Sequence, residues 1–313
     1  MRSFVPMTDR PRIVFMGTPE FAVPSLRALV EAGWPVVAVV TAPDKPAGRG
    51  RKLQASPVKA YAASQKLPVL QPEKLKRPEF LAELAGYRAD LQVVVAFRML
   101  PEVVWNMPPL GTINLHASLL PDYRGAAPIH WAVIRGERET GVTTFFLKHA
   151  VDTGDLIFQE REPIHPDDDT GAVYERLMQR GAALVVRTVA AIADGTAPRL
   201  PQREPTAEKR APKLFRETCE VDWHQPSADV VNFVRGLSPF PAAWTVLHDK
   251  KYKLYRVRDV GPRLEPAAAG AVLTDHRTHL HVGTADGRVA VEELQPEGKR
   301  RMPVEDFLRG NSL

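Results

Sequence analysis

The stretch RIVFMGTPEFAVPSLRALVEAGWPVVAVVT, residues 12–41, decides the fold of the first part of the chain. It begins with a short apolar run, residues 12–17, which ends in glycine and is typical of a buried strand. Gly33 suits the end of a helix, and residues 35–41 are again apolar and β-branched. The residues between them that recur at helical spacing are Phe21, Leu26, Leu29 and Val30. The pattern predicts a strand, a helix and a second strand.

The same alternation continues along the chain. Further helices are predicted over 56–65 and 79–86, and further strands over 68–71, 91–97 and 111–117. Strands that alternate with helices form βαβ units with a mainly parallel sheet. Continuous apolar strands indicate that both faces of the sheet are covered. We therefore predict an α/β fold, a Rossmann-like doubly wound sheet.

The composition and the pattern of predicted elements change twice after residue 140. A β-rich stretch leads into a long helix predicted over 169–195, where the first domain, 1–195, should end. Residues 196–213 hold several prolines, many charges and almost nothing apolar, which is typical of a linker. Residues 214–313 contain one helix, 227–237, followed by short alternating strands. They predict a small C-terminal β-barrel domain.

Composition narrows the class of protein. Of the 313 residues, 44% are hydrophobic and 25% are charged, which suffices for an ordinary globular core. Cys219 is the single cysteine, so an internal disulfide is excluded. There is no apolar run of membrane-spanning length and no secretory signal at the N-terminus, so we expect a cytoplasmic protein. The net charge of +5 modestly favours a polyanionic partner.

A nicotinamide-dependent enzyme is disfavoured by the first turn. The Rossmann fingerprint G-x-G-x-x-G should follow the first strand, but only Gly17 is present in the sequence Gly17-Thr18-Pro19-Glu20-Phe21. There is also no Walker A motif, and no Cys or His spacing typical of zinc. We predict no metal site.

Polar side chains end one of the predicted strands. In INLHASLLPDYRGAAP, residues 113–128, Asn114 and His116 share one face of the strand, because side chains alternate along it. Ligands of open α/β sheets bind beyond the carboxyl ends of the strands, where these residues lie. A ligand site is one interpretation. The other is that the two side chains only satisfy local backbone groups.

Two other short segments could contribute to a site. HAVDTGD, residues 149–155, carries Asp152 and Asp155, which form either an Asx-type turn or a catalytic carboxylate that must face His116. DKPAGRGRKL, residues 44–53, is either a solvated flexible loop or a mobile arm that reaches phosphates. Its basic residues are Lys45, Arg49, Arg51 and Lys52.

Taken together, these motifs resemble the methionyl-tRNA formyltransferase family of the folate-dependent formyltransferase superfamily. The resemblance runs in order through FMGTPEFAVPSL, DKPAGRGRKLQASPVK, INLHASLLPDYRGAAPIHWAVIRGERETGVT, VDTGD and PAAW, and covers nearly the whole chain. Asn-x-His before SLLP, with a later Asp-Thr-Gly, marks the superfamily. The basic loop and the C-terminal domain narrow the resemblance to the tRNA enzymes.

The resemblance implies a reaction and a set of partners. It implies transfer of the formyl group of 10-formyltetrahydrofolate to the amino group of initiator methionyl-tRNA, by a catalytic N-terminal domain. It also implies an OB-like C-terminal domain that helps to bind tRNA. We expect a monomer. The catalytic residues that it implies are Asn114, His116 and Asp152.

The resemblance also implies binding residues. The folate-contacting segment is Ser118, Leu119, Leu120 and Pro121, and Phe97 and Met99 border the pterin pocket. Arg98 stands where relatives carry glycine, in a segment that is one residue shorter. The basic loop, with Lys45, Arg49, Arg51 and Lys52, would meet the acceptor stem of the tRNA.

Two alternatives remain open at this point. A formyltransferase for a small amine, such as glycinamide ribonucleotide or an amino sugar, would use the same catalytic residues. An RNA-binding protein without activity could be built on the same scaffold, although the intact catalytic residues disfavour it. Formation of formylmethionyl-tRNA would separate these possibilities.

Overall fold

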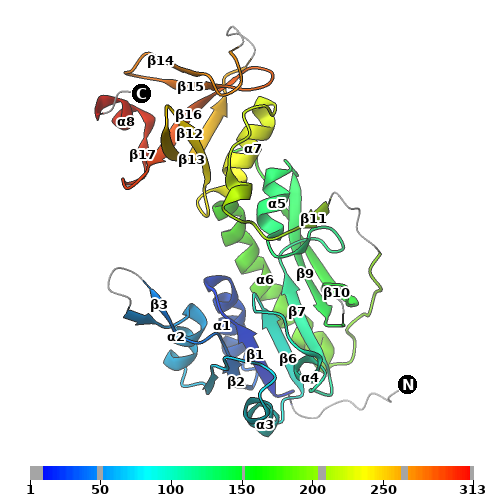
Figure 1. The fold of residues 1–313 in the computed structure, drawn as a ribbon. Coiled ribbons are helices and arrows are strands. Elements are labelled where there is room, and N and C mark those ends of the chain that lie inside the picture. The colour runs from blue at the N-terminus through cyan, green and yellow to red at the C-terminus, as the bar shows by residue number, and fades with distance from the viewer. Residues whose placement is uncertain (1–9, 48–51, 150–151, 204–208, 262–266, 311–313) are drawn as a thin grey trace. The chain divides into compact units, whose positions relative to one another are not determined.

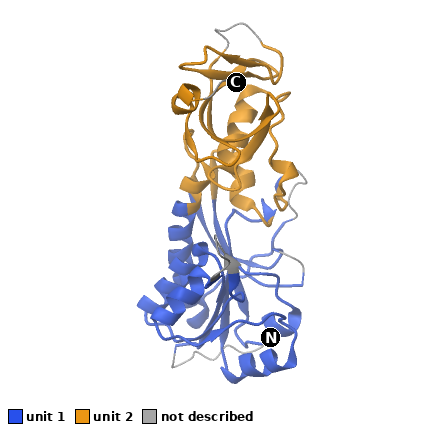
Figure 2. Ribbon diagram, turned by 60° about the vertical axis from the view of Figure 1, so that its left-hand side comes forward, with its two compact units in different colours: residues 1–124, 141–162, 175–209 blue, residues 125–140, 163–174, 210–313 orange. Residues whose placement is uncertain are grey.

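The computed structural model describes residues 10–47, 52–149, 152–203, 209–261 and 267–310. The chain folds into two compact units, and each is discontinuous in sequence (Figure 2). Unit 1 comprises residues 1–124, 141–162 and 175–209, and unit 2 comprises residues 125–140, 163–174 and 210–313. The division into continuous segments 1–195, 196–213 and 214–313 stays a prediction.

A seven-stranded sheet forms the centre of unit 1 (Figure 1). In sheet order its strands are β10 (Leu156–Pro163), β9 (Glu139–Phe146), β7 (Thr112–His116), β6 (Leu91–Val95), β1 (Ile13–Gly17), β2 (Val36–Val40) and β5 (Val69–Leu70). The strands from β7 to β5 are parallel, whereas β9 runs antiparallel to β7. The predicted Rossmann-like fold is confirmed.

The central strands are buried because helices cover both faces of the sheet. Every residue of β1 and β6 is buried. The helical segments of this part are η1 (Glu20–Ala22), α1 (Val23–Glu31), α2 (Pro57–Ser64), α3 (Pro78–Gly86), α4 (Glu102–Trp105) and α6 (Thr170–Ala193). The long helix predicted over 169–195 is thereby confirmed as α6.

The two faces of β7 have different neighbours. Leu115 points to α6, where Gly181 leaves room for it, and Thr144 of β9 shares a hydrogen bond of 2.8 Å with Thr188 of α6. On the opposite face, apolar residues of α3 and α4 pack against Val94 of β6. Asn114 pairs with Val94 in the parallel register and therefore lies on this second face.

Two local elements differ from the sequence prediction. The strand predicted over 91–97 ends at Val95, because Ala96 has a φ of 47° and turns the backbone out of the sheet. The segment predicted as a loop forms a short antiparallel pair, β3 (Lys45–Ala47) with β4 (Lys52–Gln54). We call this pair, residues 45–54, the basic arm.

Unit 2 is built around an antiparallel sheet. Its strands are, in sheet order, β12 (Ala243–Leu247), β13 (Lys250–Asp259), β16 (Arg288–Pro296), β15 (Leu280–Gly283) and β14 (Val272–Thr274), with β17 (Met302–Pro303) beside β16. The core buries Val234 of α7 (Ser227–Leu237) and Phe307 of α8 (Val304–Gly310) against these strands. The predicted β-rich C-terminal fold is confirmed, as a half-barrel, and so is the helix over 227–237.

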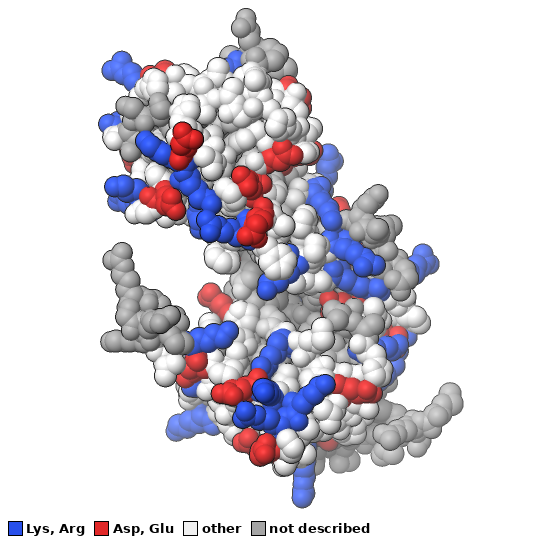
Figure 3. All heavy atoms as spheres, viewed as in Figure 1, with Lys and Arg blue, Asp and Glu red and all other residues white. Residues whose placement is uncertain are grey.

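Smaller elements complete unit 2. They are α5 (Pro128–Ile134), η3 (Glu217–Cys219) and β11 (Arg210–Ala211), which pairs with β8 (Arg124–Gly125). Figure 3 shows Lys and Arg side chains interspersed with Asp and Glu on the face in view. None of the helices in the described ranges is both long and apolar enough to span a membrane.

Candidate active site

The site lies at the carboxyl end of β7, beside β6 and β1, where ligands bind in open α/β sheets. Asn114 and His116 project from the same face of β7, opposite Phe145 and Thr143 of the neighbouring β9. His116 is 7% exposed, and Asn114 is half-buried. The sequence prediction that the two polar side chains share one face holds in the structure.

The Asn114 amide is without a partner in the described part of the chain. Its side chain makes no hydrogen bond to any described residue. A half-buried amide normally finds a partner, because an unmade hydrogen bond is costly once water is excluded. This amide is therefore available to a bound molecule, as donor or as acceptor.

The His116 ring is hydrogen-bonded at one nitrogen and faces a carboxylate at the other. Nε2 lies 2.9 Å from the carbonyl oxygen of Tyr123, and a carbonyl can only accept, so Nε2 carries a proton. Nδ1 lies 3.8 Å from Oδ2 of Asp152. This distance is longer than a hydrogen bond and within the range of an ion pair. The Asp152 carboxylate therefore faces the one ring nitrogen that can gain or lose a proton.

The structure distinguishes between the two carboxylates of the 149–155 segment. The Asp152 side chain is 12% exposed and faces His116. Asp155 instead forms an ion pair of 2.7 Å with Lys148. Asp152 has a φ of 54°, a left-handed conformation that Asp adopts more readily than most residues. Gly154 fits here because a Cβ would lie 1.5 Å from the Phe146 carbonyl oxygen.

A side chain from the predicted linker supports the turn that carries Asp152. Nε2 of Gln202 donates to the carbonyl oxygens of Asp152, at 2.9 Å, and of Gly154, at 2.7 Å. Oε1 of Gln202 accepts from Nε and Nη2 of Arg124, at 3.1 and 2.7 Å. We call Arg124 and Gln202 the clamp. Sequence reasoning assigned neither residue a role: Arg124 lies in the 113–128 stretch without a role of its own, and nothing in a segment rich in proline and charge marks Gln202.

The loop after β7 is fixed by hydrogen bonds rather than open. Ser118 is fully buried, and its hydroxyl donates to the Asp122 carbonyl at 2.6 Å. Thr143 donates to the Ser118 carbonyl at 2.6 Å and accepts from the Leu120 amide at 3.2 Å. Leu120 is 3% exposed. The peptide bond from Leu120 to Pro121 is cis.

Leu119, the remaining member of the predicted folate segment, packs against Gly141 of β9. The side chains of Ser118, Leu119 and Leu120 thus hold the loop in place. The backbone of residues 118–121 is what this loop can present to a ligand.

The segment after β6 lines an open cavity of about 910 Å³. Met99 is 77% exposed and lines it, whereas Phe97 packs against the apolar cluster beneath the sheet. Arg98, at the position where glycine was expected, donates to the carbonyl oxygens of Glu73, at 2.8 Å, and of Pro72. It therefore ties this segment to the chain that follows β5.

The basic arm is anchored at its base. Asp44 accepts from Lys59 at 2.5 Å and from Gln71 at 2.8 Å, and these bonds hold the pKa of its carboxyl below the usual value. Lys45 is exposed on β3, and Lys52 belongs to β4. Arg49 and Arg51 lie outside the described residues. The described ranges contain no cluster of three His, Cys, Asp or Glu side chains suited to a metal ion.

Comparison with known proteins places both parts of the chain. A family model described as formyl transferase matches residues 11–189, and one described as formyl transferase, C-terminal domain, matches residues 213–312. Methionyl-tRNA formyltransferase of Bacteroides fragilis is 54% identical over 309 residues, covering 96% of this chain and 95% of that protein. The protein of that name from Parabacteroides distasonis is 56% identical over 308 residues, with the same coverage.

Solved structures share the fold at low identity. An N-formyltransferase from Helicobacter canadensis, solved with folinic acid and dTDP-3-aminofucose, matches with a TM-score of 0.65 and 17% identity. The match covers 91% of this chain and 98% of that chain. HypX from Aquifex aeolicus, solved with tetrahydrofolic acid, matches with a TM-score of 0.62 and 21% identity. It covers 96% of this chain but 47% of HypX, so this chain spans about half of that protein.

Proposed function

The chain belongs to the methionyl-tRNA formyltransferase family, and from that premise we propose that Asn114, His116 and Asp152 carry out its chemistry. The enzyme transfers the formyl group of 10-formyltetrahydrofolate to the amino group of initiator methionyl-tRNA, for translation initiation. The observation that supports the residue assignment is the placement of the Asp152 carboxylate 3.8 Å from His116, with Asn114 on the same face of β7.

The Asn114 amide stabilises the oxyanion that develops during the reaction. The amine attacks the formyl carbon, and the carbonyl oxygen gains negative charge as the new C–N bond forms. A donor that is fixed before this charge appears contributes about 3 kcal/mol to catalysis. Asn114 suits this role because its amide has no other partner among the described residues.

His116 and Asp152 move the protons. The Tyr123 carbonyl holds the proton on Nε2, so Nδ1 is the basic atom. Nδ1 takes a proton from the attacking amine and returns it to the folate nitrogen as the bond from that nitrogen to the formyl carbon breaks. The Asp152 carboxylate stabilises the imidazolium between these steps. That stabilisation matters because the His116 side chain is only 8% exposed to water.

The clamp positions Asp152. Gln202 holds the carbonyl oxygens of Asp152 and Gly154 together, and Arg124 orients the Gln202 amide. A left-handed turn at Asp152 has other low-energy shapes, and the clamp selects the one in which the carboxylate faces His116. We assign Arg124 and Gln202 as positioning residues.

The remaining predicted residues bind the two substrates. The backbone of residues 118–121 and the segment with Phe97 and Met99 contact the folate. The open cavity that Met99 lines supports only the contact of Met99, because residues 118–121 and Phe97 do not line it. Lys45, Arg49, Arg51 and Lys52 of the basic arm contact the tRNA, aided by the C-terminal half-barrel. The enzyme acts as a monomer in the cytoplasm.

One assay tests the proposal. Purified protein is incubated with charged initiator tRNA and 10-formyltetrahydrofolate, and formylmethionyl-tRNA is quantified. Glycinamide ribonucleotide and an amino sugar nucleotide serve as competing acceptors in parallel reactions. Formylation of tRNA with neither small amine accepted is the expected result. Formylation of a small amine alone would contradict the proposal.

A further inference from the structure

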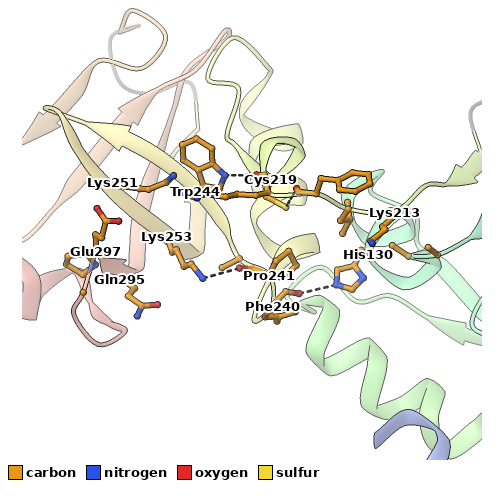
Figure 4. A pocket seen from close by; sticks show the side chains of 18 residues that line it. His130, Lys213, Cys219, Phe240, Pro241, Trp244, Lys251, Lys253, Gln295 and Glu297 are labelled. Atoms are coloured by element: carbon orange, nitrogen blue, oxygen red, sulfur yellow. Dashed lines mark hydrogen bonds between the residues drawn. The ribbon is translucent and has the colours of Figure 1, made fainter. Parts of the chain in front are cut away.

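Unit 2 contains a pocket of about 650 Å³, and Asn114, His116 and Asp152 are not among the residues that line it. Figure 4 shows it between the loop that carries Phe240 and Pro241 and the strand that carries Lys251 and Lys253. Three aromatic residues, Phe215, Phe240 and Trp244, are among the residues that line it. We call it the aromatic pocket.

The aromatic rings are unusually accessible. Phe240 is 77% exposed and Phe215 is 55% exposed, whereas most other large apolar residues of this unit are buried. Exposed aromatic surface is unfavourable in water, so a cluster of it around a pocket indicates a binding surface. Single exposed apolar side chains are common on protein surfaces, but two exposed aromatic rings beside one pocket are not.

The backbone around these rings is held in place. Trp244 donates from its indole nitrogen to the Arg216 carbonyl at 2.8 Å, which fixes the orientation of the ring. The Phe240 carbonyl accepts from Nε2 of His130 at 3.0 Å. Cys219 and Thr218 both donate to the Phe215 carbonyl, at 3.1 and 2.8 Å. The rings are therefore presented by a fixed backbone, which lowers the entropic cost of binding.

The charge around the pocket is positive. Four basic residues line it, namely Lys213, Arg216, Lys251 and Lys253. Glu297 is the single acidic residue of the lining. None of the four forms an ion pair with another residue of the described ranges. Lys251 lies 3.6 Å from the centre of the Trp244 ring, and Lys213 lies 5.4 Å from that of Phe215. Cations beside aromatic faces suit a ligand that is both flat and anionic.

We propose that the aromatic pocket binds an unpaired nucleotide of the tRNA substrate. The base stacks on the exposed rings, and the lysines contact the phosphates on either side. Stacking on aromatic side chains with basic residues along the backbone is how proteins hold single-stranded nucleic acid. A base within a duplex has no free face, so the pocket selects a nucleotide outside the helical stems. This proposal rests on the proposed function, which supplies the tRNA.

The test measures binding of uncharged initiator tRNA to the full chain, by filter binding at several salt concentrations. Phe240→Ala should weaken binding about 10-fold, since one stacked base contributes about 1–3 kcal/mol. Phe240→Leu, which keeps apolar bulk, should weaken it similarly, and Phe240→Tyr should bind like the wild type. Stacking on the Phe240 ring involves no phosphate contact, so these variants should keep the salt dependence of the wild type.

The lysines provide a second readout with a matched control. Lys251→Ala should reduce the slope of log affinity against log salt by about one, because one phosphate contact is lost. Lys250 is the next residue along β13, is exposed and does not line the pocket. Lys250→Ala should leave the slope unchanged. Equal slopes for Lys251→Ala and the wild type would overturn the phosphate contact.

Two further binding measurements distinguish an unpaired nucleotide from other ligands of the pocket. A blunt-ended RNA duplex without unpaired nucleotides should bind the wild type and Phe240→Ala equally. If Phe240→Ala weakens the duplex as much as the tRNA, the pocket does not select an unpaired base. If free AMP binds through Phe240 while tRNA affinity is unchanged, the pocket is a small-molecule site. Either result overturns the proposal, as does wild-type tRNA binding by Phe240→Ala.

The catalytic assay separates this proposal from the proposed function. Phe240→Ala should raise KM for the charged tRNA and leave kcat unchanged at saturating tRNA. If the wild type forms no formylmethionyl-tRNA, the proposed function fails. The binding measurements above then still decide whether the pocket holds an unpaired nucleotide.

Discussion

The Asp152 carboxylate lies 3.8 Å from Nδ1 of His116, and the opposite ring nitrogen is bonded to the Tyr123 carbonyl at 2.9 Å. One ring nitrogen thus faces a neutral carbonyl oxygen, and the other faces a carboxylate. In the mechanism that we propose, proton transfer at this histidine is therefore confined to Nδ1, and the Asp152 carboxylate faces the positive ring that forms.

Replacing Asp152 by Asn should reduce kcat by about 100-fold, because the imidazolium loses the charge that stabilises it. The measurement is single-turnover formylation at saturating substrates. Asp155→Asn is the matched control, since Asp155 pairs with Lys148 instead of His116. An Asp152→Asn variant as fast as Asp155→Asn would remove Asp152 from the chemistry.

Replacing Asn114 by Ala should lower kcat by about 100-fold while the protein stays as stable as the wild type. The activity falls because a fixed donor to the oxyanion is lost. Stability is unaffected because the amide has no partner among the described residues. Thermal unfolding and steady-state kinetics on the same preparation check both halves. A large fall in Tm would show that Asn114 holds the fold rather than the transition state.

Replacing Gln202 by Glu should reduce kcat about 10-fold with little change in KM. The Glu carboxylate cannot donate to the Asp152 and Gly154 carbonyls, so the turn loses its support. Arg124→Lys should give a similar loss, because lysine lacks the fork that meets Gln202. Gln65→Glu, on the surface at the end of α2, controls for the added charge. A rise in KM with an unchanged kcat would refute a positioning role.

Lys45→Ala in the basic arm should reduce the salt dependence of tRNA binding by about one unit of slope. The physical reason is the loss of one phosphate contact and of the counterion released with it. Lys74→Ala, an exposed lysine outside the arm, is the control. Identical slopes for the two variants would show that Lys45 does not contact the tRNA backbone.

Glu162 should make the stability of unit 1 depend on pH. Burial favours the neutral acid, but hydrogen bonds from Arg180 and Arg176 outweigh this effect and hold the pKa of Glu162 below its usual value of 4.5. A lowered pKa stabilises the folded state above the unfolded value, and this contribution is lost as pH falls below about 4.5 and through the folded value.

Glu162→Gln should therefore cost about 2 kcal/mol in the free energy of unfolding at pH 7, since it leaves two arginines beside a neutral amide. The cost should shrink as pH falls from 5 toward 3. Urea unfolding at several pH values measures it. A cost that does not change with pH would show that packing, rather than charge, accounts for the effect.

Several elements follow from local sequence alone. The apolar run of β1, the periodicity of α6 and the helix over 227–237 all appear where the pattern placed them. The shared face of Asn114 and His116 follows from the alternation of side chains along a strand. These features depend on backbone geometry over a few residues, so a sequence contains what is needed to predict them.

Other features depend on contacts between distant segments. Residue patterns alone left Asp152 and Asp155 both open, although the family resemblance implied Asp152. The structure places Asp152 opposite His116 through a left-handed turn and pairs Asp155 with Lys148. The basic arm differs from the prediction for a local reason, because its two short strands pair with each other within a segment that sequence reasoning took for a loop.

The sequence by itself determined the order of strands and helices, the family and the identity of the polar residues that end β7. The tertiary structure alone decided which atoms meet. Gln202 reaches Arg124 across 78 residues of chain, and no local pattern marks either residue as a partner of the Asp152 turn. Periodicity describes how a segment buries its own apolar face, whereas a hydrogen bond between distant segments exists only after both have been placed by the core.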